Sequence, residues 1–90
     1  MAGNAILIDV VDNVAVTVVP VAAGEVVVGA GIDGVTACEA IPRHHKVALV
    51  AIAAGAPVVK YGEAIGRATV AIGAGAWVHT HNMAVDKEAG

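Results

Sequence analysis

Apolar residues along this chain come in short runs, and Gly, Pro or Asp interrupts them every few positions. Val alternates with Ala and Thr over 14–19, which is the period-2 pattern of a strand with Val on one face. A second strand is expected over 4–9. Asp12 and Asn13 mark the turn between the two strands, because their side chains bond nearby backbone groups. The pattern therefore predicts an all-β protein of many short strands.

The length of the chain sets further limits. Its 90 residues suffice for one compact domain, which is expected to span 1–90. Ala and Leu favour a helix locally over 48–56, but Gly55 and Pro57 end it within one turn. The whole domain is thus expected to hold at most one or two short helical turns. The uncharged stretches are broken before they reach the roughly 18 apolar residues that a membrane-spanning helix needs, so a soluble protein is expected.

A related heptapeptide occurs three times, at 21–27, 52–58 and 72–78. Each copy begins with an apolar residue, reaches a Gly that can adopt positive φ, and continues into a stretch typical of a new strand. Chance matches within Ala- and Gly-rich sequence are the alternative, although the second and third copies are each followed by a polar motif. Three such corners predict a folded-over β-structure.

Composition narrows the range of functions. The chain has no Phe, one Trp and one Tyr, so Val, Ile and Ala fill the core and leave little room for a deep, aromatic-lined pocket. A net charge of −3 with scattered Lys and Arg argues against nucleic-acid binding. Cys38 is the single cysteine, which excludes an internal disulfide and favours the reducing cytoplasm. The lack of room for a deep pocket argues against a self-sufficient enzyme.

The C-terminal third carries the most informative polar residues, in the segment His79-Thr80-His81-Asn82. In an extended strand, Trp77, His79 and His81 project from the same face. Two imidazoles one strand repeat apart can share a divalent metal or bind a carboxylate together. A metal needs three or four protein ligands, so any metal takes further ligands from elsewhere. Surface histidines that bond water are the alternative.

A basic corner lies near the middle of the chain. Arg43 and Lys46 can help to hold an anionic ligand there. His44 and His45 point to opposite faces of an extended segment, so they are not expected to act as a pair. A solvated corner without a ligand is an equal alternative.

The segment Lys60-Tyr61-Gly62 is a third polar point. Tyr61 can hydrogen-bond a ligand, although a half-buried Tyr whose hydroxyl bonds backbone is commoner. Gly62 and Gly66 are most simply interpreted as backbone corners.

Several of these motifs follow one another in a fixed order that covers nearly the whole chain, at 12–16, 41–42, 45–49, 59–62 and 79–82. In this order and spacing the chain resembles the SAF domain of the altronate dehydratase, galactarate dehydratase and sulfolactate sulfo-lyase family. The resemblance implies a β-clip fold, related to the antifreeze-like domain of sialic acid synthases. One departure is His44, where the family pattern carries Gly. The corner is therefore expected to need either positive φ or a close approach of the backbone, so that His44 is slightly strained or alters the local site.

The same resemblance implies an activity. The family eliminates water or sulfite from a hydroxy acid next to its carboxylate, usually with a divalent metal such as iron or manganese. The resemblance thus implies a large catalytic subunit or domain as the partner, and this chain is expected to be the small part that is not active alone. The metal is expected to involve His79 and His81. The sugar-acid substrate is expected to contact Arg43, His45, Lys46, Lys60 and Tyr61.

Three roles stay open on the sequence. The leading one is an accessory subunit or domain of a metal-dependent sugar-acid dehydratase, contributing to the active-site interface of the large subunit. The second is a non-catalytic module that binds a sugar acid or metal, and the third is a structural domain that drives assembly. A homodimer is plausible too, because so many Val and Ile residues leave an apolar patch or a sheet edge to cover. The sequence fits a natural small subunit and an excised domain equally, and it does not specify which acid is the substrate.

Overall fold

The computed structural model describes residues 3–85, which form short strands and no helix. The strands are β1 (Ala5–Ile6), β2 (Val14–Thr17), β3 (Lys46–Ala48), β4 (Pro57–Lys60), β5 (Glu63–Ala68), β6 (Trp77–Val78) and β7 (Met83–Ala84). The all-β prediction is confirmed. The segment 48–56, where at most one helical turn was expected, forms none, because its backbone bonds to other segments: Ala48 N–H donates to the Ala76 carbonyl oxygen and Gly55 N–H to that of Ala68. Nothing within 3–85 forms a helix able to cross a bilayer.

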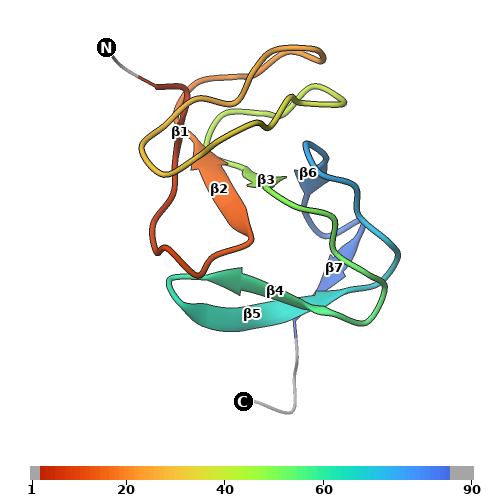
Figure 1. Ribbon diagram of the computed structural model, residues 1–90. Helices are drawn as coiled ribbons and strands as arrows, with labels where there is room; N and C mark the ends of the chain where they lie inside the picture. The colour runs from red at the N-terminus through yellow and green to blue at the C-terminus, as the bar shows by residue number, and fades with distance from the viewer. Residues whose placement is uncertain (1–2, 86–90) are drawn as a thin grey trace.

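The strands form two antiparallel sheets (Figure 1). The order is β1-β2-β3-β6 in the first sheet and β4-β5-β7 in the second, which lies at the bottom of the view. The β4–β5 hairpin contains a bulge, where the pairing shifts between Val58 and Val59. Gly66 pairs with Val58 beside this bulge, and a Cβ on Gly66 would lie 2.4 Å from the Ala84 carbonyl oxygen. Gly66 therefore permits the close approach of β7, and its interpretation as a corner is wrong.

The pair β2–β3 separates two hydrophobic cores. Ala15 and Val47 belong to one core, and Val14 and Ala48 belong to the other. All four side chains are at most 1% exposed. The predicted alternation along β2 is confirmed, but both of its faces are buried. The long loops at 21–41 cover one face, and the second sheet covers the other.

The repeated heptapeptides fold as corners of one kind. Gly24, Gly55 and Gly75 have φ values of +85°, +84° and +86°, which confirms the predicted turns. Each of these values lies in the left-handed region that a residue with a Cβ seldom adopts.

Buried apolar residues anchor the corners through paired backbone hydrogen bonds. Val21 and Ile41 exchange two such bonds, of 2.9 and 2.8 Å, and Ile52 and Ile72 exchange two bonds of 2.8 Å. The same arrangement therefore occurs twice, once over each core. The internal repeat is a structural repeat and not a chance match.

A fourth corner spans 41–46. The repeat did not reveal it, because Pro, Arg and His replace the usual Ala and Gly. His44 takes the place of the turn Gly with φ of +64°, which confirms the expected positive φ. Its N–H donates to the Thr17 carbonyl oxygen (2.9 Å), just as the N–H of Gly75 donates to the Ala48 carbonyl oxygen (2.7 Å). Since His44 carries a Cβ, its backbone is strained.

We expect the substitution His44→Gly to stabilise the domain by about 0.5–1 kcal/mol, because Gly adopts positive φ without steric cost. The melting temperature should rise by roughly 2–8 °C in a domain of this size. Thermal unfolding followed by circular dichroism measures the shift. His44→Ala is the control, since it removes the imidazole and keeps the Cβ. A melting temperature that falls in His44→Gly would mean that the hydrogen bond from Arg43 Nε to His44 Nε2 (3.2 Å) outweighs the strain.

Candidate functional site

The hairpin loop between β4 and β5 presents one of the predicted polar segments. Lys60 and Glu63 pair across the hairpin, and the two residues between them, Tyr61 and Gly62, have φ values of +58° and +73°, as in a type I′ turn. The Tyr61 side chain is 63% exposed, and the Lys60 ammonium lies 5.0 Å from its ring centre. Tyr61 is thus a surface residue, and the alternative of a half-buried Tyr is wrong.

Four aromatic rings gather where β3 meets β6. Trp77 Nε1–H donates to His45 Nδ1 (3.0 Å), and the two rings meet edge to face with 5.5 Å between centroids. His79 stacks on Trp77 at 5.7 Å and lies 4.7 Å from the His45 ring. His81 contacts the Trp77 ring at 5.0 Å. We call these four residues (His45, Trp77, His79 and His81) the ring cluster.

Strand pairing brings the two halves of the ring cluster together. β3 and β6 are antiparallel, with Lys46 opposite Val78 and Val47 opposite Trp77. The residue before β3 is therefore brought to the residue after β6, so His45 meets His79. His44 takes no part in the cluster, which agrees with the prediction that the two adjacent histidines do not act as a pair.

The chain turns directly after β6. That strand ends at Val78, and 79–82 form a turn in place of the extended strand that was expected. Buried Asn82 closes the turn, because its Oδ1 accepts from His79 N–H (3.0 Å) and its Nδ2 donates to the Trp77 carbonyl oxygen (2.8 Å). The predicted common strand face is wrong. The turn nevertheless places the rings of both His79 and His81 against Trp77.

Basic groups around the ring cluster lower one another's pKa values. The pKa of His79 is lowered by its partial burial and then by the positive charges of His45, Lys46 and His81. The pKa of Lys46 is lowered by burial and then by the charge of Lys60. Within the described residues 3–85, no carboxylate is among the causes of either shift. A bound anion would stabilise the charged forms of both groups, so the arrangement suits an anionic ligand.

A divalent metal fits the described residues less well. Within 3–85, no group of three His, Cys, Asp or Glu side chains is placed to hold a metal ion, whereas zinc-type catalytic sites use three protein ligands and structural sites four. Most ligands of a metal in a larger enzyme would therefore come from outside these residues. The contribution of His79 and His81 to such a site stays a prediction.

The structure gathers most of the predicted site residues and leaves two apart. Those linked by ring contacts or by mutual charge are His45, Lys46, Lys60, His79 and His81. Arg43 instead donates to the His44 ring, and Tyr61 stays at the hairpin tip against the Lys60 ammonium. The sequence placed Trp77 near the histidines without assigning it a role. Its signal was that it is the only Trp in a chain without Phe.

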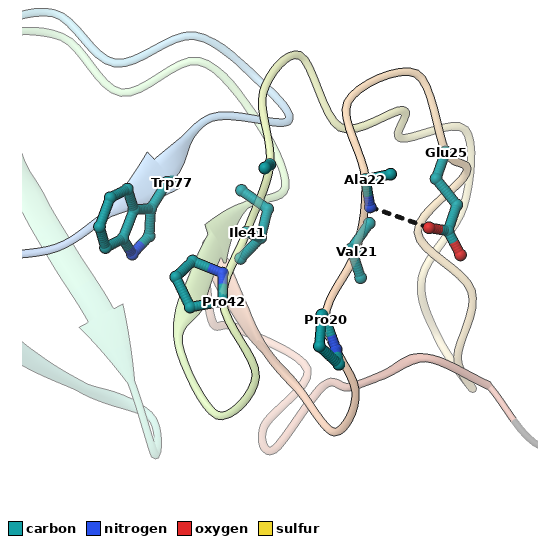
Figure 2. Close-up of a pocket in the computed structure, with 8 residues that line it drawn as sticks. Pro20, Val21, Ala22, Glu25, Ile41, Pro42 and Trp77 are labelled. Carbon is teal, nitrogen blue, oxygen red and sulfur yellow. Dashed lines mark hydrogen bonds between the residues drawn. The ribbon is translucent and has the colours of Figure 1, made fainter.

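A surface groove of about 540 Å³ opens beside the ring cluster (Figure 2). Trp77 forms one side, and Ile41, Pro42 and Pro20 lie between it and the loop that carries Glu25. The Glu25 carboxylate already accepts a hydrogen bond from nearby backbone. The remaining walls are apolar, so the groove does not suit a polyhydroxy acid. The charged side of the ring cluster is the better candidate for an anion.

The family follows from a comparison with known domains. A model of the altronate/galactarate dehydratase SAF domain matches residues 3–86. The chain belongs to this family. Altronate dehydratase of Escherichia coli (strain K12) is 46% identical to this SAF domain over 79 residues, or 86% of the chain. Galactarate dehydratase (L-threo-forming) of the same organism is 48% identical over 46 residues, or 51% of the chain.

A third relative differs from these two in length. The (2R)-sulfolactate sulfo-lyase subunit alpha of Paracoccus pantotrophus is 51% identical over 47 residues, which are 52% of this chain and 70% of that subunit. By contrast, the SAF domain spans only 15% of the altronate dehydratase and 9% of the galactarate dehydratase. SAF domains of this family thus occur inside long chains and as most of a short subunit.

Proposed function

We propose that this SAF domain is the accessory part of a sugar-acid dehydratase, acting in the cytoplasm with a large catalytic subunit or domain. The names of the two dehydratase relatives support the reaction class. The small share of those relatives that the domain spans supports a catalytic part outside these 90 residues. In this proposal the domain is inactive alone and contributes to the active-site interface.

The contribution of this chain is to bind the carboxylate of the substrate through the ring cluster and Lys46. The observation that carries this is the convergence of three basic side chains, His45, Lys46 and His79. Among residues 3–85, no carboxylate is a cause of the pKa shifts of Lys46 and His79. Imidazole and ammonium N–H groups form strong, charge-assisted hydrogen bonds to a carboxylate. The large part provides the base for the α-proton. A divalent metal such as iron or manganese, when bound in the full enzyme, polarises the substrate oxygens.

The test is an assay of altronate and galactarate dehydration with added iron or manganese. This chain, the large catalytic part and the mixture of the two are measured separately. Activity in the mixture alone is the expected result. A large part that is fully active without this chain would overturn the proposal.

Within the mixture, we expect His79→Ala to lower kcat/KM by about tenfold or more, because one hydrogen bond to a charged group contributes roughly 1.5–3 kcal/mol. His44→Gly is the matched control. It also removes an imidazole, but one outside the ring cluster, and should change kcat/KM by less than about twofold. Unchanged activity of His79→Ala in an intact complex would instead favour a purely structural role in assembly.

A further inference from the structure

A hydrogen bond inside the ring cluster decides which atom of His45 is available to a ligand. The indole Nε1–H of Trp77 can only donate, so His45 Nδ1 accepts and carries no proton. In the neutral imidazole the proton is then on Nε2. Nε2 is therefore the atom through which His45 can contact a ligand, and it presents an N–H group.

We propose that Trp77 is a positioning residue that holds His45 as the Nε2–H tautomer, so that His45 donates a hydrogen bond to the substrate carboxylate and does not ligate a metal. The identity of the anion rests on the function proposed above. The tautomer and the exclusion of a metal rest on the hydrogen bond alone.

The direction of that hydrogen bond argues against a metal on His45. A metal-bound imidazole gives the lone pair of one nitrogen to the metal and donates an N–H from the other. If Nε2 held a metal, Nδ1 would carry the proton and would face Trp77 Nε1–H, with two donors opposed at 3.0 Å. Binding of a metal through Nδ1 would displace the indole. Either arrangement breaks the observed contact.

The backbone of Trp77 is held in place on both sides by side chains. Its N–H donates to Glu39 Oε2 (3.1 Å), and its carbonyl oxygen accepts from Asn82 Nδ2 (2.8 Å). The Trp77 side chain also packs against the first hydrophobic core, and His79 stacks on its ring. A donor fixed in this way orients His45 before any ligand arrives, which reduces the cost of ordering the site on binding.

The first experiment reads the tautomer directly. Long-range ¹H–¹⁵N correlation spectra of the ¹⁵N-labelled chain, at mildly alkaline pH, distinguish Nδ1–H from Nε2–H in each histidine. We expect the Nε2–H form for His45 in the unmodified chain. Trp77→Phe keeps an aromatic ring against His79 but removes the donor, and should give a mixture of both forms at His45. An Nδ1–H form in the unmodified chain would overturn the proposal, and that spectrum needs no variant to fold. An unchanged tautomer in folded Trp77→Phe would overturn it as well.

The second experiment tests the ligand on the same signals. Galactarate should shift the His45 Nε2 resonance, whereas the uncharged polyol galactitol should not. Trp77→Phe should weaken galactarate binding by about 3–10-fold, which corresponds to roughly one hydrogen bond. No shift with galactarate, or loss of the His45 Nε2–H form on adding Zn²⁺ or Mn²⁺ alone, would overturn the assignment. Failure of the proposed function would appear instead as a mixture without dehydratase activity, with the His45 tautomer unaffected.

Discussion

Replacing Gly75 by Ala is expected to destabilise the domain by about 2–5 kcal/mol. At φ of +86° a residue with a Cβ costs roughly 1–2 kcal/mol relative to Gly. In addition, the new Cβ would lie 2.0 Å from the Thr36 carbonyl oxygen, which is backbone and cannot move aside freely. The segment carrying that oxygen is bonded to the corner, since Cys38 N–H donates to the Gly75 carbonyl oxygen (3.0 Å). Relieving such an overlap costs about 1–3 kcal/mol more.

Urea unfolding of Gly75→Ala measures this loss, and Gly24→Ala is its matched control. Gly24 has φ of +85°, but a Cβ there would meet nothing within 4 Å. The control should therefore lose only the backbone part, about 1–2 kcal/mol. Small domains have a free energy of unfolding of only about 5–15 kcal/mol. The two variants should therefore differ clearly in the urea concentration at which half of the protein is unfolded. Equal losses would show that the overlap with Thr36 is relieved by a local shift.

Replacing Asp12 by Ala is expected to cost about 3–4 kcal/mol. Its buried carboxylate accepts from three backbone N–H groups, those of Asp9 (3.0 Å), Tyr61 (3.1 Å) and Gly62 (2.8 Å). Each hydrogen bond to a charged group contributes roughly 1.5–3 kcal/mol, part of which water recovers when the carboxylate is removed. The same bonds hold Tyr61 at its positive φ, so their loss should also loosen the hairpin loop.

Chemical unfolding of Asp12→Ala alongside Asp33→Ala isolates this effect. Asp33 is exposed and carries the same charge, so its replacement should change the free energy of unfolding by no more than about 0.5 kcal/mol. Asp12→Asn keeps one acceptor oxygen and should fall between the two. If Asp12→Ala and Asp33→Ala behaved alike, the three hydrogen bonds would contribute nothing beyond what water replaces.

Most of the corners could be predicted from the sequence. Gly24, Gly55 and Gly75 were predicted as positive-φ turns, because a Gly between apolar anchors is a local signal. The repeat did not predict the corner at His44, because this corner lacks the Gly of the other copies. Long-range backbone hydrogen bonds hold His44 there in a positive-φ conformation that His does not prefer. Only the comparison with the family pattern indicated positive φ there.

The ends of the strands, by contrast, could not be predicted from the sequence. Residues 4–9 were expected to form one strand, yet β1 ends at Ile6. The chain then turns, because the Asp9 backbone is bonded to Asp12 through both its N–H and its carbonyl oxygen. Asp12 was predicted to make a turn, but its bonds to the loop at 61–62 join segments that are far apart along the chain. Local periodicity carries no information on such contacts.

The sequence by itself determined the all-β class, the Gly corners, the alternation along β2 and, through its ordered motifs, the family. The first three properties depend on residues that are close together along the chain, and the family follows from the order and spacing of the motifs. Only the tertiary structure decided that His45 meets His79, and that Trp77 bonds His45. The pairing of β3 with β6 sets both contacts, and a register depends on how the whole chain folds over its two cores.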